Sequence, residues 1–172
     1  MIMRPGQQLL LPANPVFIWV SLLLALLVNM LPLGRAPWMP DLLALVLVFW
    51  SVHQPLRVGI GVAFAFGLAM DVHQGGLLGQ HALAYTTLSY FATTIHRRLL
   101  WFSVPSQALQ VLPLFLAATA IELAVGMLAG GVFPGFSIVL SPVTETLLWP
   151  VVSVILLAPQ RRAPDPDENR PL

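Results

Sequence analysis

The feature that most constrains this chain is a series of six long apolar runs that contain very few charged residues. Of its 172 residues, 58% are hydrophobic and 9% are charged, and the mean hydropathy is +0.84. A soluble domain carries about 25% charged residues, because its surface must be wetted. A disordered chain is excluded as well, since so much apolar surface favours burial. The sequence therefore predicts an all-α integral membrane protein.

The six runs are expected to be transmembrane helices that form a six-helix bundle, with one transmembrane domain over residues 1–158. A helix needs about 20 residues to cross about 30 Å of hydrocarbon, and shorter runs span where the bilayer thins. Proline, glycine or arginine residues close the runs, as expected where helices stop. The expected spans are 16–33, 38–52, 58–72, 77–95, 108–129 and 138–158. Residues 159–172 are polar and proline-rich, and we expect them to form a disordered cytoplasmic tail.

Two of these interpretations have alternatives. The runs 38–52 and 58–72 are short, and together they are compatible with one re-entrant hairpin. The first run follows Arg4, as the apolar core of a signal peptide follows its charged start. It is longer than a usual signal-peptide core and lacks an Ala-x-Ala cleavage site, so we expect a retained helix.

The positions of the basic residues predict the orientation of the chain in the membrane. All eight basic residues are arginines. With six spans and a cytoplasmic N-terminus, only Arg35 lies on the outer side, which agrees with the positive-inside rule. We therefore expect both termini in the cytoplasm. The inner arginines are Arg4, Arg57, Arg97, Arg98, Arg161, Arg162 and Arg170.

Composition and motifs exclude several functional classes. The net charge is +1, and so small a charge produces too weak an electrostatic field to attract nucleic acid. Cysteine is absent, so disulfides, thiolate metal sites and a cysteine nucleophile are excluded. The sequence contains no P-loop, no Gly-x-Ser-x-Gly and no His-Glu-x-x-His. We expect neither an enzyme activity nor a cofactor nor a bound metal.

Polar residues of the predicted spans are concentrated in their outer half. A charged group in a span is costly, so each one needs a partner or contact with water. The inner half of the spans contains no comparable group. This one-sided arrangement predicts an outward-facing pocket or a partner-docking site. Its candidate residues are Asn29, Asp41, Asp71, His81, Glu122 and Glu145.

Helical spacing indicates that several of these side chains face other helices and not lipid. Residues four apart share a helix face, and small residues on a face let helices approach closely in a membrane. Four such faces are present. They are Ser21, Ala25 and Asn29; Gly59, Ala63, Gly67 and Asp71; Ala118, Glu122, Gly126 and Gly130; and Ala82, Thr86, Ser89 and Thr93.

Three of the acidic residues also have a structural interpretation. Asp41 and Glu145 are expected in the first turn of their helices, where a carboxylate complements the positive end of the helix dipole. Asp71 is expected at a helix C-terminus, where the dipole disfavours an anion. It therefore needs a donor from the Gly-rich turn that follows, from the start of a neighbouring helix, or from Arg35.

Glu122 is the deepest acidic residue and has no helix start to explain it. It is either protonated, paired with a polar group such as His81 or Asn29, or in contact with a water-filled pocket. A metal site built from Asp71, His73 and His81 would fit no standard ligand spacing. A pair of carboxylates for acid–base catalysis lacks an evident nucleophile or substrate clamp.

Three stretches of the sequence carry a distinctive pattern. They are Ala36-Pro37-Trp38-Met39-Pro40-Asp41-Leu42-Leu43, Gly67-Leu68-Ala69-Met70-Asp71-Val72-His73-Gln74-Gly75-Gly76-Leu77-Leu78-Gly79-Gln80-His81-Ala82-Leu83 and His96-Arg97-Arg98-Leu99. These stretches resemble the MreD family of rod shape-determining proteins. In that family an acidic residue closes the third span, and a glycine-containing turn leads into Leu-Gly-Gln-His or a similar sequence. The resemblance covers roughly residues 15–160, but the last two spans match only in hydropathy, so Glu122 and Glu145 receive no role from it.

The resemblance implies a fold similar to the membrane substrate-binding subunits of energy-coupling-factor transporters. It also implies a non-enzymatic inner-membrane subunit of the elongasome, which helps to position and regulate side-wall peptidoglycan synthesis and so maintains a rod shape. The implied partners are MreC and, through it, MreB, RodA and the elongation-specific penicillin-binding transpeptidase. Membrane lipid is a further expected partner.

Two other functions remain open from the sequence. The first is a small-solute binding membrane subunit of a transporter, in which the outer pocket holds a vitamin-like ligand. The outer loops are short and not rich in aromatic residues, which speaks against this function. The second is a membrane enzyme that acts on lipid-linked precursors, for which the sequence shows no catalytic constellation.

Overall fold

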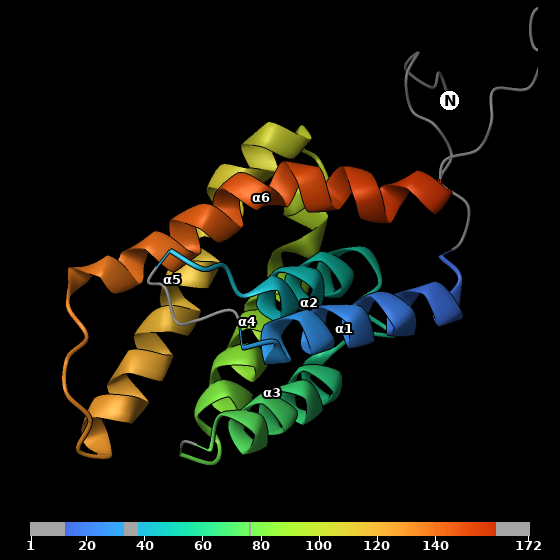
Figure 1. The fold of residues 1–172 in the computed structure, drawn as a ribbon. Coiled ribbons are helices and arrows are strands. Elements are labelled where there is room, and N and C mark those ends of the chain that lie inside the picture. The colour runs from blue at the N-terminus through green and yellow to red at the C-terminus, as the bar shows by residue number, and fades with distance from the viewer. Residues whose placement is uncertain (1–12, 33–37, 76, 161–172) are drawn as a thin grey trace, which may run out of the picture.

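In the computed structural model, residues 13–32, 38–75 and 77–160 are described. Within these ranges the chain forms six α-helices, two short 3₁₀-helices and no strand (Figure 1). This result confirms the expected all-helical chain with six helices. The α-helices are α1 (Pro15–Met30), α2 (Leu42–His53), α3 (Ile60–Gln74), α4 (Gln80–Leu99), α5 (Val104–Leu128) and α6 (Leu140–Leu157). The 3₁₀-helices η1 (Phe136–Val139) and η2 (Ala158–Gln160) flank α6.

Local sequence signals explain where several helices begin and end. Asn14 caps α1, because its side chain accepts a hydrogen bond from the backbone nitrogen of Val16 at 2.9 Å. Pro15 then occupies the first helical position, where no backbone donor is needed. Between α3 and α4, Gly75 and Gly79 adopt φ angles of +60° and +103°, which glycine accommodates without strain.

Each helix boundary differs from the expected span by one to four residues, and three of these differences have a clear consequence or cause. The fourth helix continues to Leu99, because Arg97 and Arg98 extend it and their charges favour the negative end of its dipole. The fifth helix already begins at Val104. The sixth begins at Leu140, so Glu145 lies in its second turn and its expected place in the first turn is wrong. Pro142 lies in that first turn, where its missing donor costs nothing.

Some sequence predictions lie outside the described residues. These are the conformation of the tail beyond residue 160 and the role of Arg35 as a donor to Asp71. Residue 33, the last of the expected span 16–33, also lies outside the described residues. The helix of that span, α1, ends at Met30.

Helix α2 lies at the centre of the bundle, with α1, α4 and α6 packed around it (Figure 1). Every residue from 43 to 52 is buried, as expected for a helix that is apolar all round. Two contacts between polar side-chain atoms tie α2 to its neighbours. The indole nitrogen of Trp50 donates to Ser21 Oγ of α1 at 2.8 Å, and Ser51 Oγ lies 2.9 Å from Ser89 Oγ of α4.

Helices α3 and α4 pack closely because small residues meet at their interface. A Cβ atom added to Gly67 would lie only 2.4 Å from the Cα atom of Ala82. Ala63 and Ala82 are fully buried at the same interface. The predicted small-residue face is therefore confirmed for Ala63 and Gly67, whereas Gly59 precedes α3 and lies near the backbone oxygen of Pro55.

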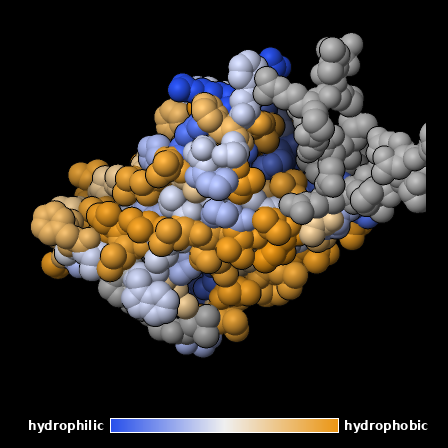
Figure 2. All heavy atoms as spheres, turned by 90° about the horizontal axis from the view of Figure 1, so that it is seen from above, coloured by the Kyte–Doolittle hydropathy of each residue, from blue (hydrophilic) through white to orange (hydrophobic). Residues whose placement is uncertain are grey.

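Much of the surface of the bundle is apolar. The segments Val104–Leu128 and Phe136–Gln160 are long and apolar enough to cross a membrane, and α1, α2 and α3 are shorter apolar helices. A broad hydrophobic band crosses the face shown in Figure 2, and hydrophilic groups lie on both sides of it. Such a surface suits contact with lipid better than contact with water.

The polar contacts show that successive helices run in alternate directions. Asn29 near the end of α1, Asp41 before α2 and Glu145 near the start of α6 share one hydrogen-bond network. Asp71 near the end of α3 bonds to the start of α4. We call this side of the bundle the acidic end; it holds Asn29, Asp41, Asp71, His81, Glu122 and Glu145. The opposite side, here called the arginine end, holds Arg57, Arg97 and Arg98.

Candidate functional site

Asp41 links three helices at the acidic end. Its Oδ1 atom accepts from the backbone nitrogen of Ala44 at 2.9 Å, which confirms the predicted role at the start of α2. The same atom accepts from Asn29 Nδ2 of α1 at 2.6 Å. The other oxygen, Oδ2, accepts from the hydroxyl of Tyr85 on α4. Asn29 completes the link, because its Oδ1 accepts from the backbone nitrogen of Leu42 at 3.2 Å.

Glu145 joins α6 to this network. Its Oε1 atom accepts from the backbone nitrogen of Asp41 at 3.1 Å and from Ser141 Oγ at 2.9 Å. The residue is only 4% exposed. Ser141 and Thr144 also lie within hydrogen-bonding distance of the backbone oxygens of Met39 and Trp38, each at 2.9 Å. The start of α6 is therefore attached to the segment that precedes α2.

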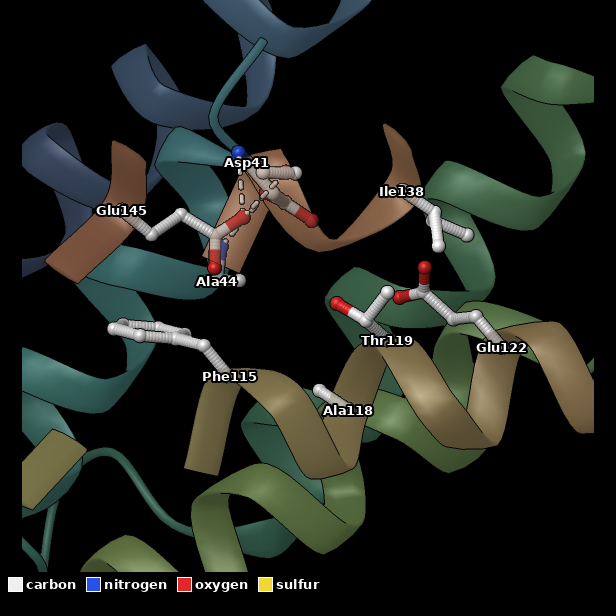
Figure 3. Close-up of a pocket in the computed structure, with 9 residues that line it drawn as sticks. Asp41, Ala44, Phe115, Ala118, Thr119, Glu122, Ile138 and Glu145 are labelled. Atoms are coloured by element: carbon white, nitrogen blue, oxygen red, sulfur yellow. Dashed lines mark hydrogen bonds between the residues drawn. The ribbon is translucent and has the colours of Figure 1, made fainter. Parts of the chain in front are cut away.

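A small cavity of about 100 Å³ lies beside this network, between α2, α5 and the start of α6. Three carboxylates line it, together with two hydroxyl groups and an apolar floor (Figure 3). Glu122 and Thr119 reach into it from α5, across from Glu145. The lining residues are Asp41, Ala44, Phe115, Ala118, Thr119, Glu122, Ile138, Ser141 and Glu145.

Glu122 is the carboxylate of this cavity that has no protein partner among the described residues. Its backbone oxygen accepts from Gln80 Nε2 at 3.1 Å, but its side chain makes no hydrogen bond there. Pairing of Glu122 with His81 or Asn29 is therefore wrong, and contact with the cavity is the alternative that the structure supports. Ionised carboxylates around one small space repel one another, so the cavity favours a proton, water or a cationic group.

Asp71 has a different role, because it caps the start of α4. It accepts backbone donors from Gly79 at 2.8 Å, His81 at 2.8 Å and Ala82 at 3.2 Å. The ring of His81 makes a fourth contact, in which Nδ1 lies 2.9 Å from Oδ1 of Asp71. The sequence left three sources of donors open for Asp71, and the structure shows that the start of α4 supplies them. The positive end of the α4 dipole stabilises the carboxylate there.

The six predicted site residues therefore fall into two groups. Asn29, Asp41, Glu122 and Glu145 surround or support the cavity. Asp71 and His81 form the cap of α4 and do not line the cavity. No cluster of histidine, aspartate and glutamate side chains suited to a metal ion occurs in the part of the chain that the structure describes.

Tyr85 connects the two groups and was not predicted. It is fully buried, its hydroxyl donates to Asp41, and its ring lies edge-on to His81 with 5.9 Å between the ring centroids. The signal was present in the sequence, since Tyr85 follows His81 by four residues and so shares its face of α4. Thr119 and Ser141 were missed as well, although they lie three and four residues before Glu122 and Glu145.

Comparison with known proteins identifies similar chains. Residues 12–162 match the family described as rod shape-determining protein MreD. The chain is 33% identical over 135 residues to the rod shape-determining protein MreD of Haemophilus influenzae (strain ATCC 51907 / DSM 11121 / KW20 / Rd). That alignment covers 76% of this chain and 81% of the relative. No solved structure matches the chain, so the expected likeness to energy-coupling-factor subunits stays a prediction.

Proposed function

The chain belongs to the MreD family of rod shape-determining proteins, and from this membership we propose that it is a non-enzymatic subunit of the bacterial elongasome. In this role it acts with MreC to help position and regulate side-wall peptidoglycan synthesis. Its links to MreB, RodA and the elongation-specific transpeptidase run through MreC. The observation that carries the proposal is the family match over residues 12–162, which include all six described helices.

We further propose that the chain is one multi-pass domain of the inner membrane with both termini in the cytoplasm. The alternating helix directions and the separation of acidic and arginine ends support this topology. Helix α2 has 12 residues and α3 has 15, so each is about 18 to 23 Å long and shorter than the hydrocarbon layer. Burial of α2 inside the bundle removes its need to match the lipid directly.

One contact favours full crossing of α2 and α3 over the re-entrant hairpin. In the α2–α3 connection, Arg57 donates from Nη1 to the backbone oxygen of Ala13 at 2.9 Å. Ala13 lies just before α1, so the connection reaches the level at which the first helix starts. A reporter fused after Leu172 tests the topology. Activity of the reporter in the cytoplasm is expected, and activity only in the periplasm would refute the orientation.

Within this function, we propose that the acid-lined cavity is a docking site for the membrane helix or juxtamembrane segment of MreC. Glu122 supports the proposal, because its carboxylate lines the cavity and makes no hydrogen bond within the described residues. A segment that brings a donor or a cationic group would satisfy it. The cavity of about 100 Å³ fits a single side chain.

Substitution of Glu122 by glutamine tests the docking site. Because no protein hydrogen bond is lost among the described residues, the variant is expected to keep the thermal stability of the wild type. Recovery of MreC by co-purification is expected to fall severalfold. Thr94→Ala, at an exposed position on α4, is the control that leaves recovery unchanged. Unchanged MreC recovery and rod-shaped cells with Glu122→Gln would count against the cavity as a docking site.

Complementation tests the shape function independently of the cavity. A rod-shaped host depleted of its own MreD is expected to become round and to regain its rod shape when this chain is expressed. Expression in the membrane without recovery of shape would refute the proposed function.

A transporter subunit that binds a vitamin-like solute is not favoured by the described cavity. Pockets for such ligands have volumes of about 300 Å³ or more, whereas this cavity measures about 100 Å³. A screen of vitamins for thermal stabilisation of the purified protein separates the two functions, because a bound ligand raises the unfolding temperature.

A further inference from the structure

The arginine end carries an exposed group of basic and apolar residues that the proposed function does not use. Arg97 and Arg98 lie exposed in the last turn of α4. The chain then turns tightly, with the backbone nitrogen of Trp101 donating to the oxygen of Arg98 at 3.2 Å. We call this group the Arg-Trp patch; it consists of Arg97, Arg98, Leu100, Trp101 and Phe102.

Intramolecular packing does not explain the apolar members of the Arg-Trp patch. Trp101 is 90% exposed, Leu100 44% and Phe102 43%. The negative end of the α4 dipole stabilises the two arginines, but the dipole does not explain why an indole ring is exposed beside them. Exposed tryptophan next to arginine is typical of the boundary between hydrocarbon and lipid headgroups.

The charge of the Arg-Trp patch is not balanced by a nearby carboxylate in the described ranges. The acidic side chains described there, Asp41, Asp71, Glu122 and Glu145, all lie at the acidic end. The ion pair found within those ranges joins His81 and Asp71 and does not include an arginine. The two guanidinium groups are therefore positioned to attract an anion from outside the bundle, and guanidinium pairs well with phosphate.

We propose that the Arg-Trp patch binds the phosphate headgroup of an anionic phospholipid in the cytoplasmic leaflet. Arg97 and Arg98 supply the charge, while Trp101 and Phe102 contact the glycerol and acyl region of the same lipid layer. The site rests on the proposed membrane topology, but it does not depend on MreC or on the acid-lined cavity. It adds a lipid-specific contact on the side of the membrane opposite to that cavity.

The test measures which lipid stays with the protein. The full chain is reconstituted into vesicles with equal amounts of phosphatidylglycerol and phosphatidylethanolamine, extracted in mild detergent, and its retained lipid is measured by mass spectrometry. The wild type is expected to retain phosphatidylglycerol preferentially. An arginine near an anionic surface contributes about fivefold to binding, so Arg97→Gln with Arg98→Gln is expected to lower the preference about twenty-five-fold.

Matched variants distinguish a defined site from general charge. Arg57→Gln removes one charge from the same end, but its guanidinium already donates to Ala13, so the preference is expected to be retained. Trp101→Ala is expected to lower lipid retention without changing the helix content of the protein. Equal loss of preference with Arg57→Gln, or an unchanged preference with both Arg97→Gln and Arg98→Gln, would overturn the proposal.

A competition experiment distinguishes the lipid from free phosphate. Excess inorganic phosphate is expected to displace no more phosphatidylglycerol than sodium chloride at the same ionic strength. Specific displacement by phosphate would identify a site for the free anion and overturn the lipid assignment. Failure to restore cell shape, together with a retained lipid preference, would refute the elongasome function and leave the lipid site supported.

Discussion

Replacement of Asp71 by asparagine tests whether this carboxylate holds the α3–α4 turn in place. The two oxygens of Asp71 accept three backbone donors and one donor from the His81 ring, and the residue is only 2% exposed. In Asp71→Asn, an amide nitrogen replaces one carboxylate oxygen. This nitrogen is itself a donor, so it cannot accept the hydrogen bonds that the oxygen accepted. About two of the four bonds are therefore lost.

The structure sets the expected size of this effect. A hydrogen bond to a charged group contributes about 1.5 to 3 kcal/mol, so loss of two such bonds predicts destabilisation of about 3 kcal/mol or more. Asp71→Ala removes all acceptors and is expected to cost more, because the backbone donors of half-buried Gly79 and buried Ala82 lose their partner. His81→Phe removes only the side-chain donor and is expected to cost about half as much as Asp71→Asn.

Thermal unfolding in detergent, with hydrogen exchange of the α4 amides, measures this prediction. The unfolding midpoint of Asp71→Asn is expected to fall clearly, and exchange at Gly79, His81 and Ala82 is expected to become faster. An unchanged midpoint with unchanged protection of these amides would show that Asp71 does not cap α4. Faster exchange spread evenly over all helices would refute a local role in the turn.

Two further variants test packing and the buried network. Gly67→Ala places a Cβ atom 2.4 Å from the Cα of Ala82, so we expect it to separate α3 from α4 and to cost about 1 to 3 kcal/mol in unfolding experiments. Gly61→Ala, on the same helix with nothing within 4 Å, is expected to be neutral or slightly stabilising, and an equal loss in both variants would refute the interface argument. Tyr85→Phe removes the hydroxyl that donates to Asp41 and is expected to cost about 1.5 to 3 kcal/mol. Tyr90 is exposed, so Tyr90→Phe is the control for Tyr85→Phe. Equal unfolding midpoints for the two variants would contradict a stabilising hydrogen bond between Tyr85 and Asp41.

Much of the fold was predictable because it depends on local order along the chain. Apolar runs, interrupted by proline and glycine, predicted six helices, since unpaired backbone groups cannot be left in an apolar surrounding. The four-residue spacing of small residues predicted that the helix face around Gly67 packs closely on another helix, and the structure places Gly67 against Ala82. The N-terminal position of Asp41 in its helix was predictable for the same reason, because capping involves neighbours only three residues away.

The composition of the candidate site was less predictable. The sequence pattern predicted that Asp71 and His81 belong with the other polar residues, because all of them occupy the same half of the predicted spans. In the structure, these two residues satisfy the start of α4 instead of lining the cavity. Depth along a helix follows from the sequence, but the direction in which a side chain meets its neighbours depends on how the helices are rotated against one another.

The sequence by itself determined the number of helices, their approximate ends, and the gathering of acidic side chains at one end. Tertiary structure decided which of these groups meet. Glu145 binds the backbone of Asp41 across 104 positions of the chain, and Tyr85 reaches the same carboxylate from a third helix. Helical periodicity describes one helix at a time, whereas such long-range contacts depend on which faces give the best packing of the whole bundle.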